Sequence, residues 1–254
     1  MSTISEQLAL PLVLPPSFRR QDFVTSPANA VALAQIGQWR GWPGGKLALA
    51  GPEGSGKSHL AHIWAAEAGG VILTPDDLRA TPADALAHWG RVAVEDADRL
   101  AGDREAEVAL FHLHNLVLAD GGRLLLTGRE EPARWPVRLP DLASRLAATP
   151  LARLEAPDDA LLSAVLAKLF ADRQLVVGPP LIDWLVRRME RTLEAARRTV
   201  ELIDRRALAE GRAVGQRLAG EVLDALDREA ARDGGTAGAG GHPAQAETLH
   251  GNGP

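Results

Sequence analysis

The chain of 254 residues contains no cysteine, and this absence excludes several kinds of site. Without cysteine there is no disulfide framework, no cysteine-ligated zinc and no thiol nucleophile. The seven histidines show no H-E-x-x-H spacing, so the zinc-peptidase motif is missing as well. A chain without disulfides fits a reducing compartment.

Long apolar runs and a basic excess are also missing. No apolar run approaches the roughly 18 residues that a membrane span needs. The first ten residues, MSTISEQLAL, lack the basic start of a secretory signal. We therefore expect a cytoplasmic protein without membrane contact. The net charge of −5 argues against a dedicated nucleic-acid binder and a sequence-specific DNA reader. The hydrophobic share of 46% and the charged share of 24% indicate a globular chain.

The distribution of apolar residues predicts an α/β domain at residues 18–150. Short apolar runs alternate there with helical stretches, a pattern typical of βαβ units and a parallel sheet with helices on its faces. The four predicted strands are Lys46–Ala50, Val71–Thr74, Val92–Val94 and Arg123–Thr127.

The pattern changes near residue 151, and from there to residue 231 it predicts helices only, in a small lid domain. The clearest predicted helix runs from about Ile182 to Leu208, because its apolar residues recur at steps of three and four. Shorter helices are predicted at Pro157–Ala171 and Gly220–Ala231. Residues 1–17 form a predicted flexible tail, and the Gly/Ala-rich residues 232–254 are predicted to be disordered.

One motif points directly to phosphate chemistry. Residues 51–58, GPEGSGKS, match the P-loop pattern G-x-x-x-x-G-K-[ST] between a predicted strand and a predicted helix. Such a loop directs backbone N–H groups at phosphate oxygens, its lysine reaches the β/γ phosphates, and its hydroxyl ligates Mg²⁺. The predicted nucleotide-binding residues are Gly51, Pro52, Glu53, Gly54, Ser55, Gly56, Lys57, Ser58 and the following His59.

Acidic residues follow the predicted strand at residues 91–94, where a P-loop needs a partner for its metal. We expect Glu95 and Ser58 to hold Mg²⁺ and Asp96 to orient the attacking water. Asp usually precedes Glu in such sites, and the inverted order here predicts weak or no hydrolysis by the chain alone. Thr127 ends the next strand, where it either senses the γ-phosphate or simply closes the strand.

These motifs, in this order and before a helical region, resemble the AAA+ ATPases and, within them, the DnaA/Hda family of replication initiators and their regulators. Arg20-Gln-Asp22-Phe23, with Asn29-Ala30 beyond it, is similar to the initiator segment that cradles the adenine. The resemblance covers roughly residues 18–230. It implies a P-loop AAA+ fold with a helical lid, ADP or ATP with Mg²⁺ as ligand, and nucleotide contacts from Asp22 and Phe23.

The resemblance also assigns roles to two arginines. Arg145, in the segment LPDLASRL, matches the arginine finger that completes the active site of a neighbouring subunit. The lid residue that touches the nucleotide matches Arg191 in one alignment and Glu194 in another. Arg191 is preferred, because a carboxylate beside phosphates would be repelled.

The tail contains a second motif, Gln7-Leu8-Ala-Leu10-Pro11-Leu12, which is similar to peptides that dock on the β sliding clamp of DNA polymerase III. Together with the AAA+ module it implies a clamp-dependent negative regulator that binds DnaA and stimulates hydrolysis of DnaA-bound ATP, with a homodimer as a further assembly. Two alternatives stay open: an autonomous P-loop ATPase of helicase-loader type, and a non-enzymatic clamp-binding adaptor with structural nucleotide.

Overall fold

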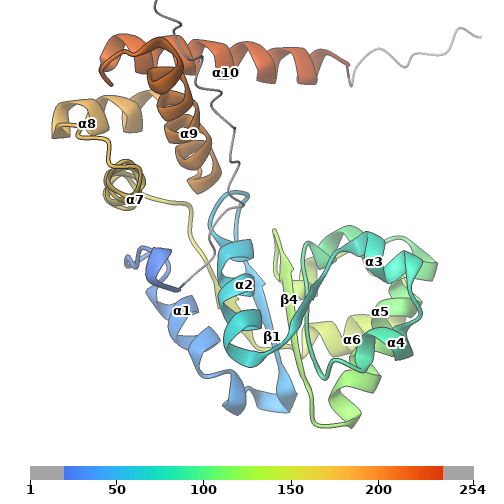
Figure 1. The fold of residues 1–254 in the computed structure, drawn as a ribbon. Coiled ribbons are helices and arrows are strands. Elements are labelled where there is room, and N and C mark those ends of the chain that lie inside the picture. The colour runs from blue at the N-terminus through green and yellow to red at the C-terminus, as the bar shows by residue number, and fades with distance from the viewer. Residues whose placement is uncertain (1–19, 237–254) are drawn as a thin grey trace, which may run out of the picture. The chain divides into compact units, whose positions relative to one another are not determined.

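The computed structural model describes residues 20–236, with side chains described as far as residue 232 (Figure 1). Contacts divide the described chain into two units. The first comprises the chain up to Val165 together with Arg191–Ala196, and the second comprises Leu166–Glu190 and the residues from Arg197 onward. None of the helices in residues 20–236 is long and apolar enough to cross a membrane.

The first unit is built on a five-stranded parallel sheet in the order β2-β3-β4-β1-β5. Four strands confirm the predicted runs: β1 (Lys46–Ala50), β2 (Val71–Leu73), β3 (Arg91–Val94) and β4 (Arg123–Gly128). The expectation of helices only after residue 150 is wrong at its start, because Leu151–Arg153 form β5. Three residues are too few to show a strand period, and only pairing with β1 makes this segment a strand.

Alternate residues of the strands face two separate cores, as the period of two in a strand requires. One core joins Leu47, Leu49 and Leu125 to α1 (Ala30–Gly37) and α2 (Lys57–Ala68). The other joins Val92, Val94, Leu124 and Leu126 to helices of the opposite face. Those helices are α3 (Pro75–Ala80), α4 (Ala83–Ala87), α5 (Arg104–Ala119) and α6 (Pro140–Ala147), and Figure 1 shows α1 and α2 on the other side of the strands from α3 to α5.

Four further helices follow β5: α7 (Asp159–Asp172), α8 (Pro179–Arg188), α9 (Leu193–Glu210) and α10 (Gln216–Thr236). The prediction of one helix over Ile182–Leu208 is wrong, since the chain leaves the helical path at residues 189–192. The apolar stripe continues in phase across this break, with Leu185, Ala196, Val200 and Ile203 all fully buried. Periodicity therefore could not reveal two helices.

Candidate nucleotide-binding site

The P-loop leaves the carboxyl end of β1 and leads into α2, as its sequence predicted. Gly54 and Gly56 have φ angles of +69° and +102°, a region that side chains disfavour. A Cβ added at Gly51 would lie 2.6 Å from the Leu154 carbonyl oxygen. The shape of the loop thus depends on these glycines, and its inner surface consists of backbone. The first N–H groups of α2 have no acceptor within the helix, which makes its start a donor set for anions.

Lys57 lies within this loop, with only 7% of its surface exposed. Its ammonium donates to the Gly51 oxygen at 2.7 Å and to the Pro52 oxygen at 2.8 Å. Burial lowers the pKa of Lys57, while the nearby Asp96 and Asp98 carboxylates oppose that shift. Since an ammonium has three N–H donors, one of them stays available for a phosphate oxygen.

The acidic residues after β3 come together with the end of β4. The Asp96 amide donates to the Thr127 hydroxyl at 3.0 Å, so Thr127 joins the two strand ends. Asp96 itself has a φ of 46°, in the left-handed region. Thr127 is 1% exposed, and its hydroxyl acts here as an acceptor.

Two buried carboxylate oxygens at this edge have no hydrogen-bond partner among the described residues: Glu95 Oε1 and Asp98 Oδ1. Glu95 Oε1 lies 3.9 Å from His62 Nδ1, and Asp98 Oδ2 accepts from the Arg129 amide at 2.9 Å. Oxygen atoms of this kind suit a hard cation. Within residues 20–232, however, no cluster of three or more His, Asp or Glu residues could hold a metal alone. Mg²⁺ would need ligands from Ser58, Glu95 and the phosphates of a nucleotide together.

The segment predicted to hold the adenine lies beside the P-loop. The Phe23 ring packs edge-on against the His59 ring at 5.2 Å between centroids, and it lies 3.8 Å from the Cβ position of Gly56. Asp22 ends a short 3-10 helix (Arg20–Asp22) just before it. Asn29 is buried, donates to the Val24 oxygen and accepts from the Ser26 amide, both at 2.9 Å. Asn29 therefore closes the loop that positions Phe23.

The break between α8 and α9 brings two residues to the P-loop that sequence reasoning missed. The Leu193 amide donates to the Gly54 oxygen at 3.0 Å. The Cβ of Thr192 lies 2.3 Å from the position of a Cβ at Gly54, and the Thr192 hydroxyl accepts from the Ala195 amide at 3.0 Å. Thr192 is thus the N-cap of α9. A threonine at this position is the local sequence signal that a new helix starts here.

The two candidates for the nucleotide-touching lid residue flank this contact. Arg191 is exposed and its guanidinium pairs with Asp159 at 2.6 Å. Glu194 is exposed in the first turn of α9. Another exposed pair, between Arg129 and the P-loop residue Glu53 at 2.7 Å, links the end of β4 to the loop.

Arg145 lies near the end of α6, away from the acidic strand ends. Its guanidinium carbon lies 5.2 Å from the centroid of the Phe111 ring of α5, and its carbonyl oxygen accepts from Lys46 Nζ at 2.8 Å. Lys46 is the first residue of β1, and the P-loop follows the last. The tail residues predicted to bind the clamp, Gln7, Leu8, Leu10, Pro11 and Leu12, lie outside the described residues.

No protein-family model matches the chain. Among solved structures, domain III of the replication initiation protein DnaA from Thermotoga maritima is 18% identical, with a TM-score of 0.71 over 83% of this chain and 97% of that one. AMPPCP-bound DnaA from Aquifex aeolicus is 17% identical, with a TM-score of 0.66 over 87% of this chain and 71% of that one. The FIGL-1 AAA domain in complex with ADP is 14% identical, with a TM-score of 0.55 over 82% and 85%. The chain thus has the α/β AAA+ fold followed by a helical region, like DnaA domain III.

Proposed function

We propose that this protein is a nucleotide-binding AAA+ regulator of the initiation of DNA replication. It binds the β sliding clamp through residues 7–12 and stimulates hydrolysis of the ATP bound to DnaA. Its own P-loop holds ADP or ATP with Mg²⁺. It acts in the cytoplasm, on DNA that carries the clamp.

The position of Arg145 is the observation that carries this proposal. The residue is exposed, and its backbone is bonded to the start of β1. At about 3.3 Å per residue, β1 places roughly 13 Å between Lys46 and Ala50, just before the P-loop. That distance favours a guanidinium that serves the nucleotide of a neighbouring molecule. An arginine finger supplied in trans contributes on the order of 10³–10⁵ in rate by stabilising transition-state charge.

Nucleotide binding is supported by the chain's own residues and by its structural neighbours. The P-loop backbone and the available N–H donor of Lys57 suit a phosphate chain. The carboxylate oxygens of Glu95 and Asp98 that have no hydrogen-bond partner among the described residues suit its cation. A DnaA structure and an AAA domain with this fold were solved with AMPPCP and with ADP. Bound Mg²⁺ would supply positive charge to the phosphates, with Ser58 and Glu95 as its protein ligands.

In the proposed role the nucleotide of this chain is mainly structural. Phe23 and His59 would contact the base side, and the Leu193–Gly54 bond would link nucleotide occupancy to the start of α9. Asp96 would orient water in any hydrolysis by the chain itself. The inverted Glu-Asp order favours weak turnover, because the shorter Asp96 side chain reaches less far.

The test measures phosphate release from ATP-loaded DnaA, with and without this protein, in the presence of clamp loaded on DNA. We expect the protein to accelerate release only when the clamp is present. The variants Arg145→Ala and Gln7→Ala should each abolish the acceleration. The control Arg217→Ala removes an arginine that is 89% exposed on α10, and it should behave as the unchanged protein.

Two results would contradict the proposal. Intact clamp binding without acceleration would make the protein a clamp-binding adaptor. Comparable ATP turnover by the protein alone, unaffected by Arg145→Ala, would make it an independent ATPase.

A further inference from the structure

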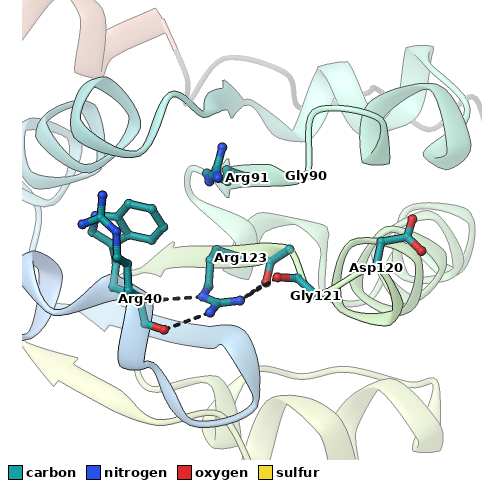
Figure 2. A pocket seen from close by; sticks show the side chains of 8 residues that line it. Arg40, Gly90, Arg91, Asp120, Gly121 and Arg123 are labelled. Atoms are coloured by element: carbon teal, nitrogen blue, oxygen red, sulfur yellow. Dashed lines mark hydrogen bonds between the residues drawn. The ribbon is translucent and has the colours of Figure 1, made fainter.

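A cluster of arginines lies at the amino ends of the strands, at the opposite end of the sheet from the P-loop. A pocket of about 470 Å³ opens at the amino ends of β3 and β4 (Figure 2). Because the strands are parallel, this edge is remote from the carboxyl ends that carry the P-loop and the acidic residues. We call it the arginine pocket, and its side-chain lining is Trp39, Arg40, Arg91, Asp120 and Arg123.

Arg123 builds the floor of the arginine pocket. Its guanidinium donates to the carbonyl oxygens of Trp39 at 3.2 Å, Arg40 at 2.9 Å, Gly121 at 2.7 Å and Gly122 at 2.8 Å, and Figure 2 shows it between Arg40 and Gly121. These bonds use four of its five N–H donors. Its backbone amide donates to the Gly90 oxygen at 2.8 Å. One residue thus joins three separate segments of the chain at the floor of the pocket.

Arg40 and Arg91 supply the exposed charges. Both guanidinium carbons lie over the ring of Trp39, at 4.2 Å and 5.5 Å from its centroid. Trp39 is 6% exposed and cannot move freely. Cation–π contact therefore holds two arginine side chains, one from the short 3-10 helix Trp39–Gly41 and one from the start of β3, against the same fixed ring.

The charge of the pocket is unbalanced. Within the described residues, none of the three arginines forms an ion pair with a carboxylate within 4 Å, whereas most other arginines of the structure do. Asp120 is the one carboxylate in the lining, so three positive charges face a single negative charge. Like charges gathered without a carboxylate partner repel one another, and an anion would relieve that repulsion.

We propose that the arginine pocket binds a phosphate group, with Arg40 and Arg91 as its ligands and Arg123 as the fixed charge beneath. Two guanidinium groups suit the oxygens of phosphate through paired N–H donors. The pocket is open and both arginines are exposed, which favours a phosphate carried by a larger molecule, such as the backbone of DNA. The Trp39 ring is covered and offers no face to a base, so this binding would not depend on sequence.

The experiment compares two double variants with equal net charge. Arg40→Gln with Arg91→Gln removes both ligands, and Arg134→Gln with Arg217→Gln removes two exposed arginines elsewhere. Binding of a short labelled DNA duplex is measured by fluorescence anisotropy over a range of salt concentrations. Free phosphate is titrated separately while the indole N–H signal of Trp39 is followed by NMR. The P-loop is identical in both variants, so its own phosphate binding affects them equally.

We expect the pocket variant to weaken DNA binding about tenfold at low salt and to reduce the salt slope by about 2, because each phosphate contact contributes roughly one unit. The control should resemble the unchanged protein. Arg40→Lys with Arg91→Lys should keep the salt slope, which guards against a folding defect. A Trp39 shift with free phosphate, lost in the pocket variant while DNA binding is unchanged, would assign the site to a free phosphate compound. If the two glutamine double variants bind the DNA duplex equally and show the same Trp39 response to free phosphate, the proposal is wrong.

Discussion

The buried imidazole of His114 makes a sharp prediction about pH. His114 lies on α5 with 3% of its surface exposed, and its Nε2 faces Lys46 Nζ at 3.3 Å. The ammonium can only donate, so Nε2 accepts and the ring is neutral. Its Nδ1 lies 3.4 Å from Asn115 Oδ1, which can accept the ring proton. Burial, followed by the charge of Lys46, lowers the pKa of His114 from 6.5 to about 4.

The magnitude follows from the difference between the folded and unfolded pKa values. The unfolded chain takes up the proton near pH 6.5, whereas the folded protein does so near pH 4. The contribution of the neutral His114 to the free energy of unfolding is therefore complete above pH 6.5, and it is lost as the pH falls from 6.5 to about 4. A pKa difference of this size lowers the free energy of unfolding by about 3 kcal/mol once the pH is below both pKa values, and by about 2 kcal/mol at about pH 5.

The assay is chemical denaturation at about pH 7.5 and about pH 5, a range that lies above the titration of most carboxylates. The free energy of unfolding of the unchanged protein should fall by about 2 kcal/mol more than that of His114→Gln over this range. His112→Gln, at an exposed position of the same helix, should keep the full loss. If His114→Gln and the unchanged protein lose the same free energy, the imidazole is not buried in its neutral form and the reasoning is refuted.

Three further predictions concern other contacts. Glu107 is fully buried and accepts from the amides of Gly102, Arg138 and Leu139. Burial raises the pKa of Glu107, but these hydrogen bonds together outweigh it and lower the pKa. Glu107→Ala should therefore lower the free energy of unfolding by about 3–5 kcal/mol in chemical denaturation, because three amides lose an ionised acceptor, and a cost below about 1 kcal/mol would contradict this. Gly54→Ala should destabilise the protein more than Gly69→Ala, which has the same φ of +69° and open space around it, and equal melting temperatures would show that Thr192 yields at little cost. Lys57→Ala should weaken ADP binding in calorimetry by roughly 10- to 150-fold, the worth of one charge-assisted hydrogen bond, and unchanged affinity would place the nucleotide elsewhere.

Much of the first unit could be predicted from the sequence, because its signals are local. The P-loop is a continuous segment, and Gly54 and Gly56 are required there by the positive φ angles of its own backbone. Four strands show as short apolar runs because both faces of a parallel sheet are buried. The placement of Glu95, Asp96 and Thr127 at one edge follows from the common direction of the strands.

Other features depend on partners far away in the chain. β5 exists because Leu151–Arg153 pair with β1, about 100 residues earlier by the numbering. The break before α9 interrupts an apolar stripe that continues in phase, and the Leu193–Gly54 bond accompanies it. Neither segment contains a local pattern strong enough to reveal these contacts.

The P-loop, the strands around it and the α/β class can be predicted from the residues alone, since short-range backbone geometry and residue periodicity encode them. The strand order, the contact of Thr192 and Leu193 with the P-loop, the neutral His114 and the arginine pocket emerge only in the folded chain. Each of these features rests on hydrogen bonds, burial or ring contacts between residues from separate elements, and such contacts leave no local pattern. Arg40, Arg91 and Arg123 are ordinary surface arginines in the sequence, and folding around Trp39 brings them together.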